Sequence, residues 1–223
     1  MVAGSRVAVI LLGAVALVAV PTASAEIRAS CTIEGTPGDD DLVGTPGADV
    51  ICGKGGDDRI EGRGDDGVLL GGRGRDSIWG GSGDDVISAG PDDDTGIISG
   101  GRGDDRIRLG AGRDADATGG PGSDRIWGGP QSDALTDRSS DLDVLRGGEG
   151  RDHVSAFGGR DRVYGGPGGD ACLSTYDRAP GDTIVGGPGV DTASSDAGDR
   201  TVRVERFSLP AVPAVPFCWP DGG

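Results

Sequence analysis

The chain has 223 residues and a net charge of −16, with 46 Gly and 13 Pro against only 3 Trp, 2 Tyr and 3 Phe. So few large side chains cannot fill a thick globular core, which excludes a conventional two-layer fold. The negative charge repels nucleic acids and anionic membranes and attracts cations instead. Because low hydrophobicity with high charge is also typical of disordered chains, the order of the residues has to decide whether the protein folds.

Residues 1–25 have the pattern of an export signal. Arg6 precedes an apolar stretch from Val7 to Val20, and the small-residue pattern Ala23-Ser24-Ala25 precedes Glu26. The stretch is short for a membrane span and ends at a typical cleavage site, so we expect cleavage and a secreted protein. An uncleaved anchor is the alternative. Since the signal contains one Arg and no acid, its removal would leave 198 residues with a net charge of −17.

A nine-residue period begins at Gly35 and continues to residue 194, after a short segment 26–34 that we expect to form a strand capping the first repeat. The frame is G-[G/x]-x-G-x-D-x-[apolar]-x, and it fits 17 windows. Glycines at its first, second and fourth positions are expected to permit the positive φ angles and the bare backbone that tight turns need. Extra residues interrupt four windows and are expected to bulge outward; these windows are 89–99, 109–118, 137–146 and 174–185.

Two columns of the frame carry the pattern. The sixth position is aspartate in every window except 62–70, where Gly67 stands. The aspartates are Asp40, Asp49, Asp58, Asp76, Asp85, Asp94, Asp105, Asp114, Asp124, Asp133, Asp143, Asp152, Asp161, Asp170, Asp182 and Asp191. The eighth position is mostly a branched apolar residue, namely Leu42, Ile51, Ile60, Leu69, Ile78, Ile87, Ile107, Ile126, Leu135, Leu145, Val154, Val163 and Ile184. A single aspartate in such a turn usually caps it, but sixteen in register require another explanation.

The repeat resembles the RTX, or haemolysin-type, calcium-binding nonapeptide, whose consensus is G-G-x-G-x-D-x-U-x with U a large apolar residue. Gly71-Gly72-Arg73-Gly74-Arg75-Asp76-Ser77-Ile78-Trp79 is one of the cleanest copies, and the resemblance covers residues 35–194. It implies an all-β protein: a right-handed parallel β-roll, or β-helix solenoid, of nine-residue repeats capped at both ends. Two windows would form one coil, with six residues of turn and three of strand in each.

The resemblance also implies several calcium ions, each shared by the loops of windows n and n+2, in one row along each edge. Turn carbonyls and sixth-position carboxylates offer the oxygens that calcium prefers, whereas magnesium requires a tight octahedron. The absence of Cys and His ligands disfavours zinc and copper. Gly67 would interrupt one row. Because stacked aspartates about 4.8 Å apart repel without a cation, we expect folding and calcium binding to be one process.

Residues at the seventh and ninth positions should point outward, because strand side chains alternate between faces. If the insertions preserve this alternation, one sheet carries a basic and aromatic face made of Arg106, Arg108, Arg125, Trp127, Arg146, Arg162 and Tyr164. Such a face on an acidic protein suits an anionic glycan, a surface polymer or a second copy of the roll. The alternative is that these arginines form salt bridges with loop carboxylates.

The chain contains four cysteines, Cys31, Cys52, Cys172 and Cys218, an even set that favours two disulfides in an exported protein. Three pairings are possible, and we favour Cys31–Cys52 and Cys172–Cys218 because each would tie one end of the repeats to the adjacent segment. A thiolate metal site is the alternative, although no C-x-x-C spacing exists. Residues 195–223 are expected to cap the roll with a last strand and a Pro-rich tail, unless that tail serves sorting or docking.

No catalytic motif accompanies the repeats. The chain has no H-E-x-x-H and no G-x-S-x-G in a strand-to-helix setting, and its one histidine, His153, occupies an outward position. We therefore expect no enzyme, but a secreted calcium-binding protein that serves as a structural or adhesive module at the cell surface or in the matrix. The alternative is a lytic or hydrolytic effector that carries RTX repeats.

Overall fold

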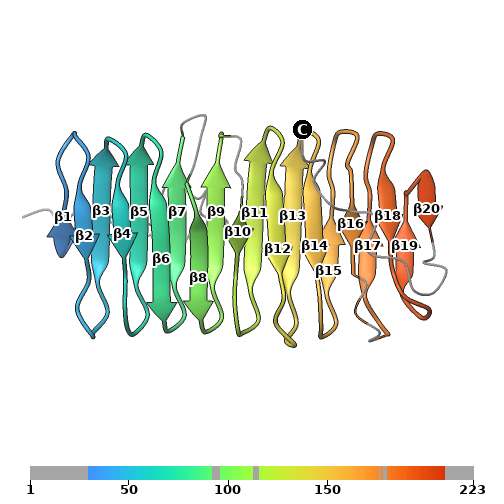
Figure 1. Cartoon of the computed structure of the whole chain (residues 1–223), viewed down its shortest axis with the longest axis horizontal. Helices are drawn as coiled ribbons and strands as arrows, with labels where there is room; N and C mark the ends of the chain where they lie inside the picture. Colours follow the sequence, from blue (N-terminus) through green and yellow to red (C-terminus); the bar gives the residue numbers. More distant parts are fainter. Residues whose placement is uncertain (1–29, 92–95, 113–115, 176, 178–179, 209–223) are drawn as a thin grey trace, which may run out of the picture. The chain divides into compact units, whose positions relative to one another are not determined.

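The computed structural model describes residues 30–91, 96–112, 116–175, 177 and 180–208 (Figure 1). The predicted signal peptide, Asp94, Asp114 and Cys218 lie outside the described residues. The chain divides into two compact units, Met1–Ser30 and Cys31–Gly223, and the second contains all of the repeats.

Two ten-stranded parallel sheets form the fold, and successive strands alternate between them (Figure 1). The first sheet contains β1 (Ile33–Glu34), β3 (Val50–Gly55), β5 (Val68–Arg73), β7 (Val86–Gly90), β9 (Arg106–Gly110), β11 (Arg125–Pro130), β13 (Val144–Glu149), β15 (Arg162–Tyr164), β17 (Thr183–Val185) and β19 (Arg200–Val202). The second contains β2 (Asp41–Val43), β4 (Arg59–Glu61), β6 (Ser77–Ser82), β8 (Ile98–Arg102), β10 (Ala117–Thr118), β12 (Ala134–Asp137), β14 (His153–Ala156), β16 (Leu173–Ser174), β18 (Thr192–Ser194) and β20 (Arg206–Ser208).

This arrangement confirms the predicted parallel β-roll. Each strand pairs with the strand two places along the chain, so two nonapeptide windows make one coil. The described residues include no helix, and hence none long and apolar enough to cross a membrane. Several strands are longer than expected, because β3, β5, β6, β11 and β13 run for 6 residues and extend into the glycines of the next window.

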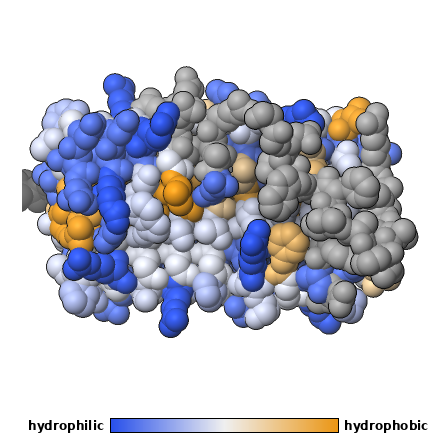
Figure 2. Space-filling model, viewed as in Figure 1, coloured by the Kyte–Doolittle hydropathy of each residue, from blue (hydrophilic) through white to orange (hydrophobic). Residues whose placement is uncertain are grey.

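The core is a thin stack of apolar side chains between the two sheets, with one from most windows and a second, Ala89, Leu109 or Ala156, from three of them. Apart from Leu42, which is partly buried near one end, every apolar residue predicted at the eighth position is at most 1 % exposed. The structure adds Ile98, Ala117, Leu173 and Ala193 to these rows. On the coloured part of the face drawn in Figure 2, hydrophilic residues and residues of intermediate hydropathy predominate, and apolar residues form separate spots.

The insertions lie between strands and leave the alternation of faces intact. Ile78 pairs with Ile98 across the two extra residues of window 89–99, and Ile107 pairs with Ile126 across the extra residue of window 109–118. Register in a sheet is fixed by which side chains must be buried, so the strands keep their pairing and the extra residues fall in the connections between strands.

Both ends of the roll continue the sheets. Beyond residue 194, β19 pairs with β17 and β20 pairs with β18, so the sheets extend further than the frame read from the sequence. At the other end β1 pairs with β3, and the Cys31–Cys52 disulfide joins the start of β1 to β3 with a Cα–Cα distance of 5.9 Å. Cys172 is also disulfide-bonded, and Cys218, its predicted partner, is not among the described residues.

The glycines of the frame serve two different purposes. Fourth-position glycines such as Gly74 (φ 114°) adopt the positive φ that was expected. First-position glycines do not adopt positive φ, and there only the second reason, the need for bare backbone, applies. At Gly100 a Cβ atom would lie 2.2 Å from Oδ2 of Asp105 and 2.7 Å from the carbonyl oxygen of Gly119. The first position is therefore glycine because two oxygens approach its bare Cα.

Candidate metal sites along the loop edges

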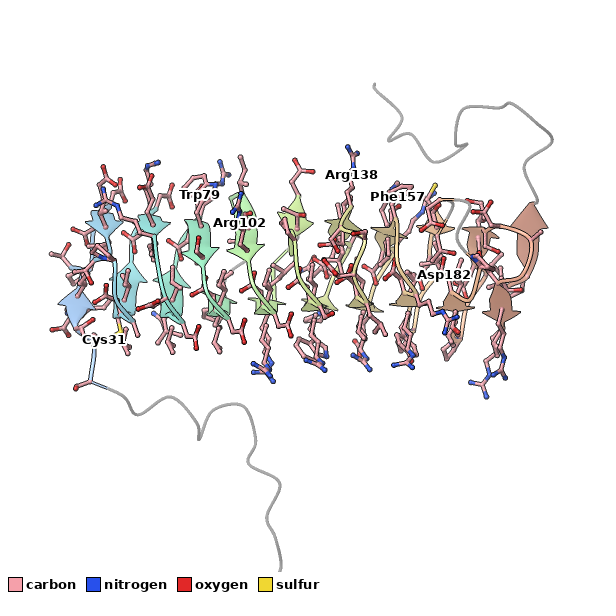
Figure 3. All side chains as sticks on the ribbon, turned by 90° about the horizontal axis from the view of Figure 1, so that it is seen from below. Cys31, Trp79, Arg102, Arg138, Phe157 and Asp182 are labelled. Atoms are coloured by element: carbon pink, nitrogen blue, oxygen red, sulfur yellow. A yellow bond between two sulfur atoms is a disulfide. The ribbon has the colours of Figure 1, made fainter. Side chains whose placement is uncertain are left out.

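The sixth-position aspartates line the two edges of the roll, where the loops of alternate windows stack. Along the edge that follows the even-numbered strands, the described members are Asp49, Asp85, Asp105, Asp124, Asp143, Asp161 and Asp182. Along the other edge they are Asp40, Asp58, Asp76, Asp133, Asp152, Asp170 and Asp191. Asp182 is labelled in Figure 3. From Asp58 onward all of these side chains are at most 3 % exposed, although aspartate is rarely buried without a partner.

In most of these aspartates one carboxylate oxygen ties adjacent coils together. Oδ1 of Asp105 accepts the backbone N–H of Asp85 at 2.8 Å, and Oδ1 of Asp124 accepts that of Asp105 at 2.7 Å. The same bond continues through Asp143, Asp161 and Asp182 on this edge, and it joins Asp133, Asp152, Asp170 and Asp191 on the other. These bonds place the loops of windows n and n+2 side by side.

The other oxygen, Oδ2, is buried, and it accepts no hydrogen bond from the described part of the chain in nine of these aspartates. They are Asp58, Asp85, Asp105, Asp124, Asp152, Asp161, Asp170, Asp182 and Asp191. A buried carboxylate oxygen without a partner is costly, and its repetition along both edges indicates a ligand. The Cα of a first-position glycine and a carbonyl oxygen of the next coil lie beside this Oδ2 atom. At Gly80, for example, a Cβ atom would lie 2.4 Å from Oδ2 of Asp85 and 2.2 Å from the carbonyl oxygen of Gly100. This all-oxygen set fits a hard cation such as calcium.

Burial also changes the acidity of these carboxyl groups. Desolvation raises the pKa of Asp85, Asp152 and Asp182 to about 6, that of Asp105, Asp143 and Asp170 to about 7, and that of Asp124 and Asp161 to about 8. Backbone hydrogen bonds oppose this rise in pKa, and in most of these groups repulsion between neighbouring carboxylates adds to it. A bound cation would remove both causes of the shift.

The edges are not uniform. Gly67 supplies no carboxylate, and its N–H donates to Oδ1 of Asp85 at 2.7 Å. At the first windows, Oδ2 of Asp40 and Asp49 accepts the N–H of Thr36 and Thr45, which is the geometry of a capped turn. These bonds hold the pKa of the exposed Asp49 carboxyl below its usual value.

Three acidic residues near the edges were missed by the sixth-position pattern. Asp137 occupies the first position of its window, is fully buried, and lies with Asp124 and Asp143 in one cluster. Asp199 accepts the N–H of Asp182, and Glu205 accepts that of Asp191, so both extend the rows beyond residue 194. Asp137 is the only acid at a first position, which is a signal the sequence already contained.

The predicted basic and aromatic face lies on the first sheet. Arg108, Trp127, Arg146 and Tyr164 follow one another in register, and the guanidinium of Arg146 lies 5.8 Å and 4.7 Å from the ring centres of Trp127 and Tyr164. Arg106, Arg125 and Arg162 occupy the neighbouring column. In Figure 3 nitrogen-tipped side chains line the side of the roll opposite the labelled Trp79. None of these five arginines forms an ion pair with a described residue, so the salt-bridge alternative finds no support.

Comparison with known proteins agrees with this geometry. No curated protein matches the chain. A family model, the RTX calcium-binding nonapeptide repeat (4 copies), matches residues 34–69, 61–95, 97–115, 117–136, 139–171 and 181–202. The chain therefore belongs to the RTX calcium-binding nonapeptide repeat family and is a calcium-binding repeat protein.

Proposed function

We propose that the protein is secreted, folds as it binds several calcium ions, and serves as a structural or adhesive module at the cell surface or in the extracellular matrix. The observation that carries this proposal is the set of nine buried Oδ2 atoms named above, distributed over both edges, which receive no hydrogen bond within the described residues. Calcium bound there would neutralise the carboxylates and join neighbouring coils.

The sixth-position aspartates would hold the ions together with first-position carbonyl oxygens. At one such place Oδ2 of Asp105 and the carbonyl oxygen of Gly119 both face the bare Cα of Gly100. Calcium accepts six to eight oxygens in flexible geometry, which suits loops that differ in length and sequence. Magnesium retains its waters and demands an octahedron, so it would stabilise the roll poorly.

Export and a non-enzymatic role rest on separate observations. Residues 1–25 have the pattern of an export signal, and the Cys31–Cys52 disulfide is typical of proteins that mature in an oxidising compartment. A hydrolytic effector would need a nucleophile and base that the sequence motifs do not provide. A structural module requires only a rigid roll and an outward face.

Equilibrium dialysis of the purified chain against radioactive calcium tests the proposal. We expect several ions per chain at saturation, together with poor competition by excess magnesium. Binding of no calcium, or equal displacement by magnesium, would contradict the proposed function.

The outward face of the first sheet is the proposed contact for an acidic polysaccharide. Arg106, Arg125 and Arg162 form no ion pair among the described residues, and the alternating Arg108, Trp127, Arg146 and Tyr164 offer cations beside aromatic rings. Guanidinium groups pair with sulfate and carboxylate, while aromatic rings stack on sugar rings. Pairing two copies through this face would bring like charges together, so charge complementarity favours an anionic glycan over such a dimer.

A double variant on each sheet tests this contact with heparin as the probe, in saturating calcium. Trp127→Ala with Arg146→Ala is expected to weaken heparin binding by about tenfold or more. Arg59→Ala with Trp79→Ala is the matched control, because it removes a similar cation and ring, with 4.7 Å between the guanidinium carbon and the ring centre. In this pair the arginine already has Asp41 and Glu61 as ionic partners. Equal heparin binding by both double variants would contradict the polysaccharide proposal. If the unchanged chain is a dimer, and the first double variant becomes monomeric but still binds heparin, the face is a contact between copies and the proposal is also wrong.

A further inference from the structure

Asp137 is the last residue of β12 and stands where most other windows have a first-position glycine. In the preceding coil on this edge that position is Gly119, and a Cβ there would lie 2.1 Å from Oδ2 of Asp124. Window 137–146 contains one extra residue, so six positions separate Asp137 from Asp143, whereas five separate Gly119 from Asp124. The longer loop gives room for a side chain at this place.

The carboxylate of Asp137 is fully buried and held by backbone groups. Its Oδ2 accepts the N–H of Gly119 at 3.0 Å and the N–H of Gly120 at 2.9 Å, while Oδ1 accepts the N–H of Ser139 at 2.8 Å. These three N–H donors fix the position of the carboxylate against the neighbouring coil. The side chain is thus oriented before any ligand arrives.

Asp137 completes a cluster of three carboxylates. One oxygen from each of Asp124, Asp137 and Asp143 lies within 4.8 Å of the other two, and all three residues are 0 % exposed. Oδ2 of Asp143 accepts the hydroxyl of Ser139 at 3.0 Å, whereas Oδ2 of Asp124 accepts no hydrogen bond from any described residue. Oxygens bound to one calcium at about 2.3 to 2.6 Å can be up to about 5 Å apart, so a single ion can contact all three carboxylates.

We propose that Asp124, Asp137 and Asp143 form a three-carboxylate calcium site that binds more tightly than the other sites of the roll and fills first. This inference rests on the proposed function. In the three preceding coils on this edge the first position is glycine, at Gly80, Gly100 and Gly119, and in the two following windows it is Ala156 and Ser174, so Asp137 is the only first-position carboxylate of this edge. Calcium affinity rises with the number of charged ligands and with the rigidity of the site, and Asp137 adds to both.

The test is equilibrium dialysis of the full chain against radioactive calcium over a wide range of free calcium. The unchanged chain is expected to retain one ion at free calcium about tenfold below the concentration that fills the remaining sites. Asp137→Asn should lose this first ion while keeping the later ones. Asp141→Asn is the matched control, because it removes the same charge from the same loop at an exposed residue outside the cluster.

Asp137→Gly is the second variant, because it restores the residue found at most first positions. Circular dichroism at saturating calcium establishes which of the variants fold. Loss of the first ion in every folded Asp137 variant but not in Asp141→Asn would support the site. The proposed site would be wrong if either Asp137 variant still bound a first ion tightly, or if the unchanged chain showed a single class of calcium sites. In both cases the protein would still bind calcium, so the proposed function would stand. Failure of the unchanged chain to bind calcium would overturn the proposed function as well.

Discussion

Chelation of calcium at neutral pH is expected to unfold the roll. The core contributes only one or two apolar side chains per window, which offers little to oppose the loss of backbone entropy on folding. Without a cation the buried carboxyl groups must either remain charged in a desolvated site, where neighbouring carboxylates repel one another, or take up protons. At a free calcium concentration of 100 times the dissociation constant of a site, the ion in that site adds about 2.7 kcal/mol to the free energy of unfolding. Several ions together can therefore determine whether the chain folds.

The measurement is circular dichroism of the purified chain in EDTA and then in excess calcium. We expect the β-strand signal to be lost in EDTA and recovered with calcium, but not with the same concentration of magnesium. A sodium chloride titration in EDTA is the control for simple charge screening, because salt weakens repulsion between exposed charges more than between buried ones. A β-strand spectrum that chelation does not change would show that the ions are not needed for folding.

In the absence of calcium, the chain is expected to fold at acidic pH. The folded-state pKa values of Asp105, Asp124 and Asp161 are about 7 to 8, above the ordinary value of 3.8. A raised folded-state pKa means that the folded chain holds these protons more tightly than the unfolded chain. The resulting stability is fully present below about pH 4 and is lost as the pH rises through about 6 to 8.

In metal-free buffer the β-strand signal should therefore be strongest at acidic pH and disappear towards about pH 8. In calcium the dependence reverses, because protons and calcium compete for the same Oδ2 atoms, and calcium affinity should rise over the same interval. Dilute samples are needed near the isoelectric point of about 4.3. A metal-free chain that is more ordered at pH 8 than under acidic conditions would contradict the assigned burial of these carboxylates.

The period of nine determined most of what the sequence could predict. It placed the apolar row, the aspartate rows and, through the parity of the windows, the outward arginines and aromatic residues, because a strand exposes alternate side chains. Ile98 and Ala117 were missed since insertions displaced them from the counted column, and only strand register assigns them to the core. Strands β19 and β20 were beyond the frame because residues 195–208 keep the pairing while losing the repeated glycines.

The role of individual carboxylates was harder to read. A column of aspartates predicts ligands, but it does not show that Oδ1 is engaged by the backbone of the preceding coil while Oδ2 remains for a ligand. The first position illustrates the same limit, because glycine there looked like a turn residue and is in fact required by the close approach of two oxygens. Asp137 departs from that rule, and only the three-dimensional cluster reveals why.

Locating the ions tests the central claim most directly. Crystals of the chain grown in calcium, measured at a long X-ray wavelength where calcium scatters anomalously, should show peaks in two rows beside the Oδ2 atoms of the stacked aspartates, with one peak among Asp124, Asp137 and Asp143. A folded roll whose peaks are absent from these edges, or occur only at surface carboxylates, would contradict it.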